Sequence, residues 1–283
     1  DLFEVPRSML PVVCENASDF GRTKLLGGEI NIGGVAGDQQ AALIGQCCFH
    51  PGEVKSTYGT GCFMIANTGN EALFSKNRLL TTIGYKIDGQ TTFALEGSIF
   101  VAGSAIQWLR DGLGFFKDSA ETEDMAKLSS ADSKVMVIPA LTGLGAPYWD
   151  PDARGAIFGL TRDTGKEDIT RATLEAIAYQ SRDLLEAMNK DNATFQKLMI
   201  DGGMVVNDWF SQKLSNTLGI EVIRPKIIET TSLGAAFLAG LQAGIFEDFK
   251  SLEDSKKIDR TFIPIEEESR YREWKEAVSR TLT

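Results

Sequence analysis

The sequence has 283 residues, of which 29 are Lys or Arg and 39 are Asp or Glu, so the net charge is −10 at neutral pH. Hydrophobic residues make up 43% and charged residues 24%, which predicts a globular chain with a sizeable core and excludes a disordered one. The acidic balance excludes a nucleic-acid surface, and the most apolar stretch, residues 233–246, is too short to span a membrane.

The first part of the chain reads as a mixed lead-in followed by strands. Residues 54–58 and 62–66 are short strand-like runs that are joined by a glycine-rich turn. Residues 82–87 and 91–95 alternate between apolar and polar side chains, and Asp88-Gly89 between them is a strong hairpin signal.

Helices dominate the middle of the chain. Ser98 can cap a helix whose apolar residues recur at three- and four-residue steps as far as Leu113. Residues 164–167 fit a capping box in front of a helix over residues 169–188, and residues 197–200 read as a buried strand.

The last part of the chain continues the alternation. Asn207 can cap a helix that Gly219 ends, and a strand over residues 220–223 follows. Ser232 can cap a helix over residues 233–244, and a last amphipathic helix lies within residues 271–282. Alternating strands and helices predict the α/β class.

Histidine and cysteine usage excludes several kinds of site. The sequence has one histidine, His50, so a zinc site built on several histidines is excluded. His50 precedes a proline and is expected at the surface. No Gly-x-Ser-x-Gly turn supplies the serine of a catalytic triad. The four cysteines form no Cys-x-x-Cys pair, and we expect reduced, mostly buried thiols in a cytoplasmic protein.

The run GDQQAA (residues 37–42) puts an acid at the start of a helix-like segment. Aspartate there is often a purely structural helix cap. Gln39 and Gln40 are poor choices for a cap alone, because their amides suit hydroxyl groups. The pattern leaves two readings for Asp38, a helix cap or a proton acceptor for a substrate hydroxyl.

The run YGTGC (residues 58–62) is a second candidate. Gly59 and Gly61 around Thr60 would let backbone N–H groups and a hydroxyl approach an anion, although an ordinary hairpin turn has the same pattern. The run is not a Walker A loop, and Met64 at its last position excludes Gly-x-Gly-x-x-Gly.

Two further candidates depend on glycine. The run DGG (residues 201–203) lies between a strand and a helix, which suits a phosphate or a nucleoside, and Asn207 follows Gly203 by one helical turn. Gly103 and Gln107 lie four residues apart on one helix face. Each pattern is also that of an ordinary turn or a helix-packing contact.

Together these motifs resemble the FGGY family of carbohydrate kinases. The family pattern is carried by Gly155, Ile157, Gly159 and Leu160 and, after seven residues, by Asp168, Ile169 and residues 172–175. Longer runs at residues 37–42, 57–64, 105–111, 146–149 and 231–236 resemble the branch of the family that phosphorylates glycerol. The match runs in order over nearly the whole chain.

The resemblance implies a ribonuclease H-like (actin-like ATPase) fold in a two-domain kinase whose active site lies between the domains. Residues 32–283 would be the second domain, with its C-terminal helix, and residues 1–31 the lead-in from a first domain that this sequence lacks. The phosphate loop and glycerol contacts of that first domain are missing, so we expect the chain alone to be inactive.

The resemblance also implies a role for each candidate residue. Asp38 would be the general base on a glycerol hydroxyl, Gln39 a second substrate contact, and Phe63 a wall against the glycerol carbons. Thr60 would touch the phosphates of ATP or ADP. The remaining nucleotide contacts would be Gly103, Gln107, Gly203 and Asn207. Mg²⁺ would bridge phosphate oxygens, and no residue of the chain is expected to bind it directly.

Alternatives remain at this stage. The chain could belong to a kinase for another polyol or sugar, or to a non-catalytic actin- or Hsp70-like nucleotide-binding module. The GDQQ run favours a kinase, because a scaffold does not need a proton acceptor aimed at a hydroxyl. The oligomeric state stays open, homo-oligomers being common in the family.

The resemblance also bears on regulation. Some bacterial members of the family are inhibited by fructose 1,6-bisphosphate, which binds a basic loop shortly before the GDQQ motif. The corresponding residues 27–31 read GGEIN, and the carboxylate of Glu29 would repel a bisphosphate. We therefore expect insensitivity to this sugar.

Overall fold

The computed structural model describes residues 3–191, 193, 195–267 and 269–283. A seven-stranded mixed sheet forms its centre, in the order β11-β10-β9-β3-β4-β6-β5. The strands are β3 (Val54–Tyr58), β4 (Cys62–Gly69), β5 (Leu80–Ile87), β6 (Gln90–Ile99), β9 (Lys197–Asp201), β10 (Glu221–Pro225) and β11 (Ile258–Phe262). Strands β3, β9 and β10 are parallel, and every other pairing in the sheet is antiparallel.

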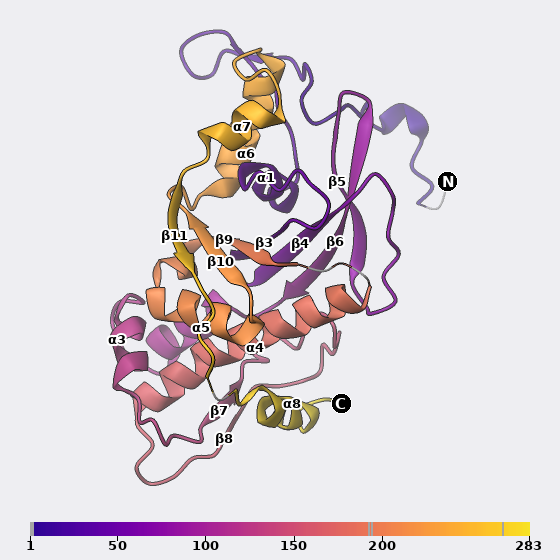
Figure 1. Cartoon of the computed structure of the whole chain (residues 1–283). Coiled ribbons are helices and arrows are strands. Elements are labelled where there is room, and N and C mark those ends of the chain that lie inside the picture. The colour runs from indigo at the N-terminus through magenta and orange to yellow at the C-terminus, as the bar shows by residue number, and fades with distance from the viewer. Residues whose placement is uncertain (1–2, 192, 194, 268) are drawn as a thin grey trace.

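Helices cover both faces of this sheet (Figure 1). On one face lie α1 (Asp38–Gly45), α6 (Thr230–Gln242) and α7 (Phe249–Ser255). On the other lie α4 (Lys166–Lys190) and α5 (Asp208–Leu218). A hydrophobic core lies on each face of the sheet, and successive side chains of β4 point into one or the other. Met64 packs toward α4 and α5, and Ile65 packs toward α1.

Helices α1 and α6 approach closely because each has a glycine at the contact. A Cβ on Gly45 would collide with the carbonyl oxygen of Thr230, and one on Gly234 would collide with that of Ala41. Gly234, one of the small residues of the apolar stretch 233–246, thus serves helix packing. No described helix has the length and apolar character needed to cross a membrane.

Smaller elements surround this centre. Below it in Figure 1 lie α3 (Glu121–Leu128), the two-stranded sheet of β7 (Met136–Ile138) and β8 (Ala156–Phe158), and α8 (Tyr271–Ser279). The α-helix α2 (Gly103–Gln107) continues into the π-helix η2 (Trp108–Gly112). Near the N-terminus lie η1 (Arg7–Met9), β1 (Arg22–Thr23) and β2 (Ile30–Asn31).

Three expected helix starts are wrong. Ser98 and Ile99 end strand β6, where they pair with β4, and the helix begins only at Gly103. The cap of α4 is Gly165, whose N–H donates to the Asp168 carboxylate at 3.0 Å, one residue beyond the expected box. Ser232 lies inside α6 and donates to the carbonyl of Glu229, so the helix starts at Thr230. The helical spacing of apolar residues shows that a helix is present but does not locate its first residue, because the preceding strand or turn can continue the same spacing.

Candidate functional site

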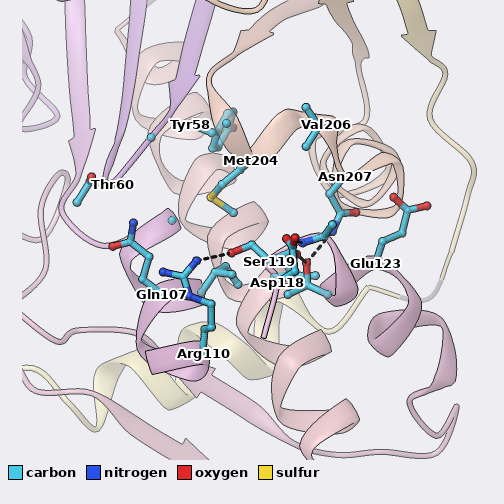
Figure 2. A pocket seen from close by; sticks show the side chains of 17 residues that line it. Tyr58, Thr60, Gln107, Arg110, Asp118, Ser119, Glu123, Met204, Val206 and Asn207 are labelled. Atoms are coloured by element: carbon cyan, nitrogen blue, oxygen red, sulfur yellow. Dashed lines mark hydrogen bonds between the residues drawn. The ribbon is translucent and has the colours of Figure 1, made fainter. Parts of the chain in front are cut away.

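A cavity of about 490 Å³ opens beside the turn that joins β3 to β4. It is walled by that turn, α2, η2, α3, α4 and the segment after β9, and it brings together all five expected nucleotide contacts: Thr60, Gly103, Gln107, Gly203 and Asn207. In Figure 2, Thr60 and Gln107 lie at one end of the cavity, and Asn207 and Glu123 lie at the other. The cavity falls within the volume range of small-molecule sites.

The glycine turn is fixed by the start of α2. The N–H of Gly103 donates to the carbonyl of Gly59 at 2.9 Å, and the N–H and hydroxyl of Ser104 both donate to the carbonyl of Thr60. A Cβ on Gly103 would lie 2.5 Å from the Gly59 oxygen, so only glycine allows this approach. The Thr60 side chain is exposed at the mouth of the cavity.

The second wall comes from the end of β9, which is parallel to β3. Gly202 has a φ of +93°, and a Cβ there would lie 2.5 Å from the Tyr58 carbonyl oxygen. Gly203 lines the cavity, and a Cβ there would meet no atom within 4 Å. The carboxyl ends of parallel strands are where α/β folds place their ligands.

Asn207 has the structural role that its position predicts. Its Oδ1 accepts from the Phe210 N–H at 2.8 Å and caps α5, and its Nδ2 donates to the Thr122 hydroxyl of α3 at 3.2 Å. The neighbouring N–H of Asp208 donates to the Glu123 carboxylate at 2.9 Å. These bonds tie α5 to α3 across one end of the cavity.

Sequence reasoning missed the part of the lining that α3 and the segment before it supply. Those residues are Asp118, Ser119, Ala120, Thr122 and Glu123. Arg110 also lines the cavity, three residues after Gln107, and its guanidinium pairs with Asp111 at 2.7 Å. Arg110 could have been predicted, because it lies three residues after Gln107 on the same helix face. No sequence motif indicates that α3 lines the cavity.

Asp38 and Gln39 lie on the other face of the sheet, at the start of α1. Gly37 is the N-cap, so Asp38 is the first residue of the helix and not its cap. One carboxylate oxygen, Oδ1, accepts from the Gln39 N–H at 2.8 Å, and Oδ2 meets the Gln39 Nε2 only at 3.4 Å. Asp38 is exposed and keeps an oxygen able to accept a proton.

The side chains of β3 connect Gln39 to the same end of the sheet. The Lys55 Nζ donates to the Gln39 Oε1 at 2.5 Å and to the Thr57 hydroxyl at 2.8 Å. Phe63 is half-buried on β4 and stands opposite Thr57 in the ladder, on the same sheet face. The expected substrate residues and the expected nucleotide residues therefore approach the end of β3 from opposite faces.

The described residues contain no cluster of three or more His, Cys, Asp or Glu that could hold a metal ion. Magnesium is often bound by one or two carboxylates together with substrate phosphates. The exposed carboxylate of Asp38 suits that kind of site through an intervening water.

Comparisons with known proteins identify one family. Residues 54–243 match the model of the FGGY family of carbohydrate kinases, C-terminal domain. The chain is 57% identical to a glycerol kinase of Alcanivorax borkumensis and 54% identical to glycerol kinase 1 of Pseudomonas aeruginosa, over 99% of the chain in both cases. These alignments cover 57% and 58% of the two relatives, so the chain spans less than two thirds of their length.

Solved structures agree with the family match. The crystal structure of Plasmodium falciparum glycerol kinase with ADP superposes with a TM-score of 0.87 at 37% identity, over 98% of this chain and 57% of that one. A xylulose kinase from Lactobacillus acidophilus, only 21% identical, gives 0.80 over 99% of this chain and 58% of that one, a likeness of fold alone. The expected α/β, actin-like class is thus confirmed.

Proposed function

The chain belongs to the FGGY family of carbohydrate kinases, and we propose that it forms the nucleotide-binding and base-bearing part of a glycerol kinase, which transfers the γ-phosphoryl group of ATP to glycerol. The main structural support is the single cavity around Thr60, Gly103, Gln107, Gly203 and Asn207, with Asp38 at the same end of the sheet. The relatives named glycerol kinase support the choice of glycerol.

In this proposal the nucleotide lies along the cavity. Its phosphates approach the glycine turn at Thr60, and its nucleoside lies toward Asn207, where Gly203 leaves open space. Phosphoryl transfer asks mainly for alignment of the groups and for neutralised charge. Bound Mg²⁺ would neutralise phosphate charge, and Asp38 would hold it through water.

Asp38 would remove the proton during transfer. A glycerol hydroxyl oxygen attacks the γ-phosphorus, the bond to the ADP oxygen breaks, and the hydroxyl proton passes to the Asp38 carboxylate, giving glycerol 3-phosphate and ADP. The Oδ2 atom is suited to this because its hydrogen bond from the Gln39 amide is long, at 3.4 Å. Gln39 would hold a second hydroxyl, and Phe63 would face the carbons.

We propose that a first domain completes the site, because the relatives are longer than this chain. The test is a coupled ADP-release assay on the complete enzyme with a panel of polyols and sugars. Turnover that depends on glycerol supports the proposal. ATP turnover without any polyol, or a clear preference for another sugar, contradicts it.

Residues 1–283 alone provide a second arm of this test. They should bind ADP weakly through the cavity without forming glycerol 3-phosphate. Product formation by this chain would mean that the missing half of the site has been wrongly assigned.

A further inference from the structure

Lys55, the second residue of β3, is fully buried, and the proposed transfer reaction assigns it no direct role. Among the described residues, no carboxylate oxygen lies within 4.0 Å of its Nζ, and its hydrogen bonds go to the Gln39 Oε1 and the Thr57 hydroxyl. Burying an ammonium group without an adjacent carboxylate is costly. The lysine is therefore a poor choice for stability alone.

The charges around Lys55 lie farther away, on three neighbouring elements. Burial lowers the pKa of Lys55, and Asp201 on β9 and Glu96 on β6 oppose that effect. Burial likewise raises the pKa of Glu96, against the attraction of Lys55, and Asp38 on α1 raises it further. Lys55 is thus a buried cation whose charge is balanced at a distance by Asp201 and Glu96.

The hydrogen bond to Gln39 fixes which way that amide points. An ammonium group donates and cannot accept, so Gln39 must turn its Oε1 toward Lys55. Its Nε2 then faces the Asp38 Oδ2, 3.4 Å away. A flipped amide would set an NH₂ group against an NH₃⁺ group, with no acceptor between them.

We infer that Lys55 is a positioning residue that holds the Gln39 amide with its N–H groups toward Asp38 and the substrate hydroxyls. This inference rests on the proposed function. It assigns to Lys55 an effect on glycerol alone, because neither Lys55 nor Gln39 lines the nucleotide cavity.

The test is a double-mutant cycle in the complete enzyme with Lys55→Met, Gln39→Ala and both changes together. Lys55→Met should raise the KM for glycerol about tenfold and leave the KM for ATP nearly unchanged. In the Gln39→Ala background the same change should have no further effect, because Lys55 acts through Gln39. The melting temperature of Lys55→Met should stay close to that of the parent, because removal of the buried charge offsets the lost attraction to Asp201 and Glu96.

Lys213 supplies the matched control. It is also a buried lysine, but its Nζ pairs with Glu175 at 3.2 Å and Glu267 at 2.7 Å, away from the substrate residues. Lys213→Met should lower the melting temperature and leave both KM values unchanged, because it removes one of the two cations that pair with the buried Glu175, the other being Arg171 at 3.1 Å.

The inference is overturned by additive effects in the cycle, by an unchanged KM for glycerol, or by a Lys55→Met protein that loses activity and melting temperature together. A parent enzyme that does not phosphorylate glycerol would instead refute the proposed function. If the parent phosphorylates glycerol and Lys55→Met has the same KM for glycerol as the parent, only this inference is refuted.

Discussion

The Gly203→Ala protein should be as stable as the parent and should bind nucleotide more weakly. A Cβ at this position meets no atom within 4 Å, and Gly203 lines the cavity. The adjacent Gly202 is a matched contrast, since its φ is +93° and a Cβ there would lie 2.5 Å from the Tyr58 carbonyl oxygen. The two alanine variants separate a ligand effect from a folding effect.

The structure sets the size of each effect. Gly202→Ala combines a left-handed backbone, about 1–2 kcal/mol, with a clash against main chain, about 1–3 kcal/mol. The melting temperature should fall by at least about 5 °C. Gly203→Ala should change stability by no more than about 0.5 kcal/mol. Its methyl group would overfill a packed nucleotide site and weaken ADP binding about tenfold or more.

Thermal unfolding and calorimetric titration with ADP measure both variants against the parent. Gly203→Ala should melt with the parent and bind ADP more weakly, whereas Gly202→Ala should melt earlier. A Gly203→Ala protein with parental ADP affinity would refute the placement of the nucleotide. A Gly202→Ala protein as stable as the parent would refute the packing argument.

Two further predictions concern regulation and reactivity. The complete enzyme should keep its activity in fructose 1,6-bisphosphate, because residues 27–31 carry no Lys or Arg and Glu29 already engages the neighbouring cations Arg22 and Lys24 in ion pairs; inhibition that disappears when residues 27–31 are changed would contradict this. A thiol titration at about pH 8 should find one fast cysteine, the exposed Cys14, since burial raises the pKa of Cys47 to about 11 and the thiolate is the reactive form. Four fast thiols in the folded protein would be incompatible with the buried positions of the other three.

Helix caps and tight turns can be predicted from the sequence, because they depend on residues close together in the chain. Asn207 caps α5 and Gly219 ends it in a left-handed conformation, as their residue types indicate. Asp88 and Gly89 both have positive φ, which the hairpin between β5 and β6 requires. Ser98 misleads because its neighbours satisfy helical spacing by chance, while pairing with β4 keeps it in a strand.

The site is predictable only in part, for the same reason. Motifs identify Thr60, Gly103 and Gly203, but the contact of Asn207 with α3 joins residues 85 positions apart. The link from Lys55 to Gln39 also crosses from a strand to a helix on its face, and no motif in the sequence indicates it. Such contacts follow from the packing of α1 and α3, which no local pattern encodes.

Replacement of Asp38 by asparagine in the complete enzyme tests the central claim most directly. The Asp38→Asn side chain would keep an oxygen for the Gln39 N–H, which lies 2.8 Å from the Asp38 Oδ1, and would lose the ability to take a proton together with the negative charge. General-base catalysis typically contributes about 10²–10⁴-fold. We predict that kcat falls at least about a hundredfold, with melting temperature and ADP affinity unchanged. A kcat within a few-fold of the parent would contradict the assignment of Asp38 as the base.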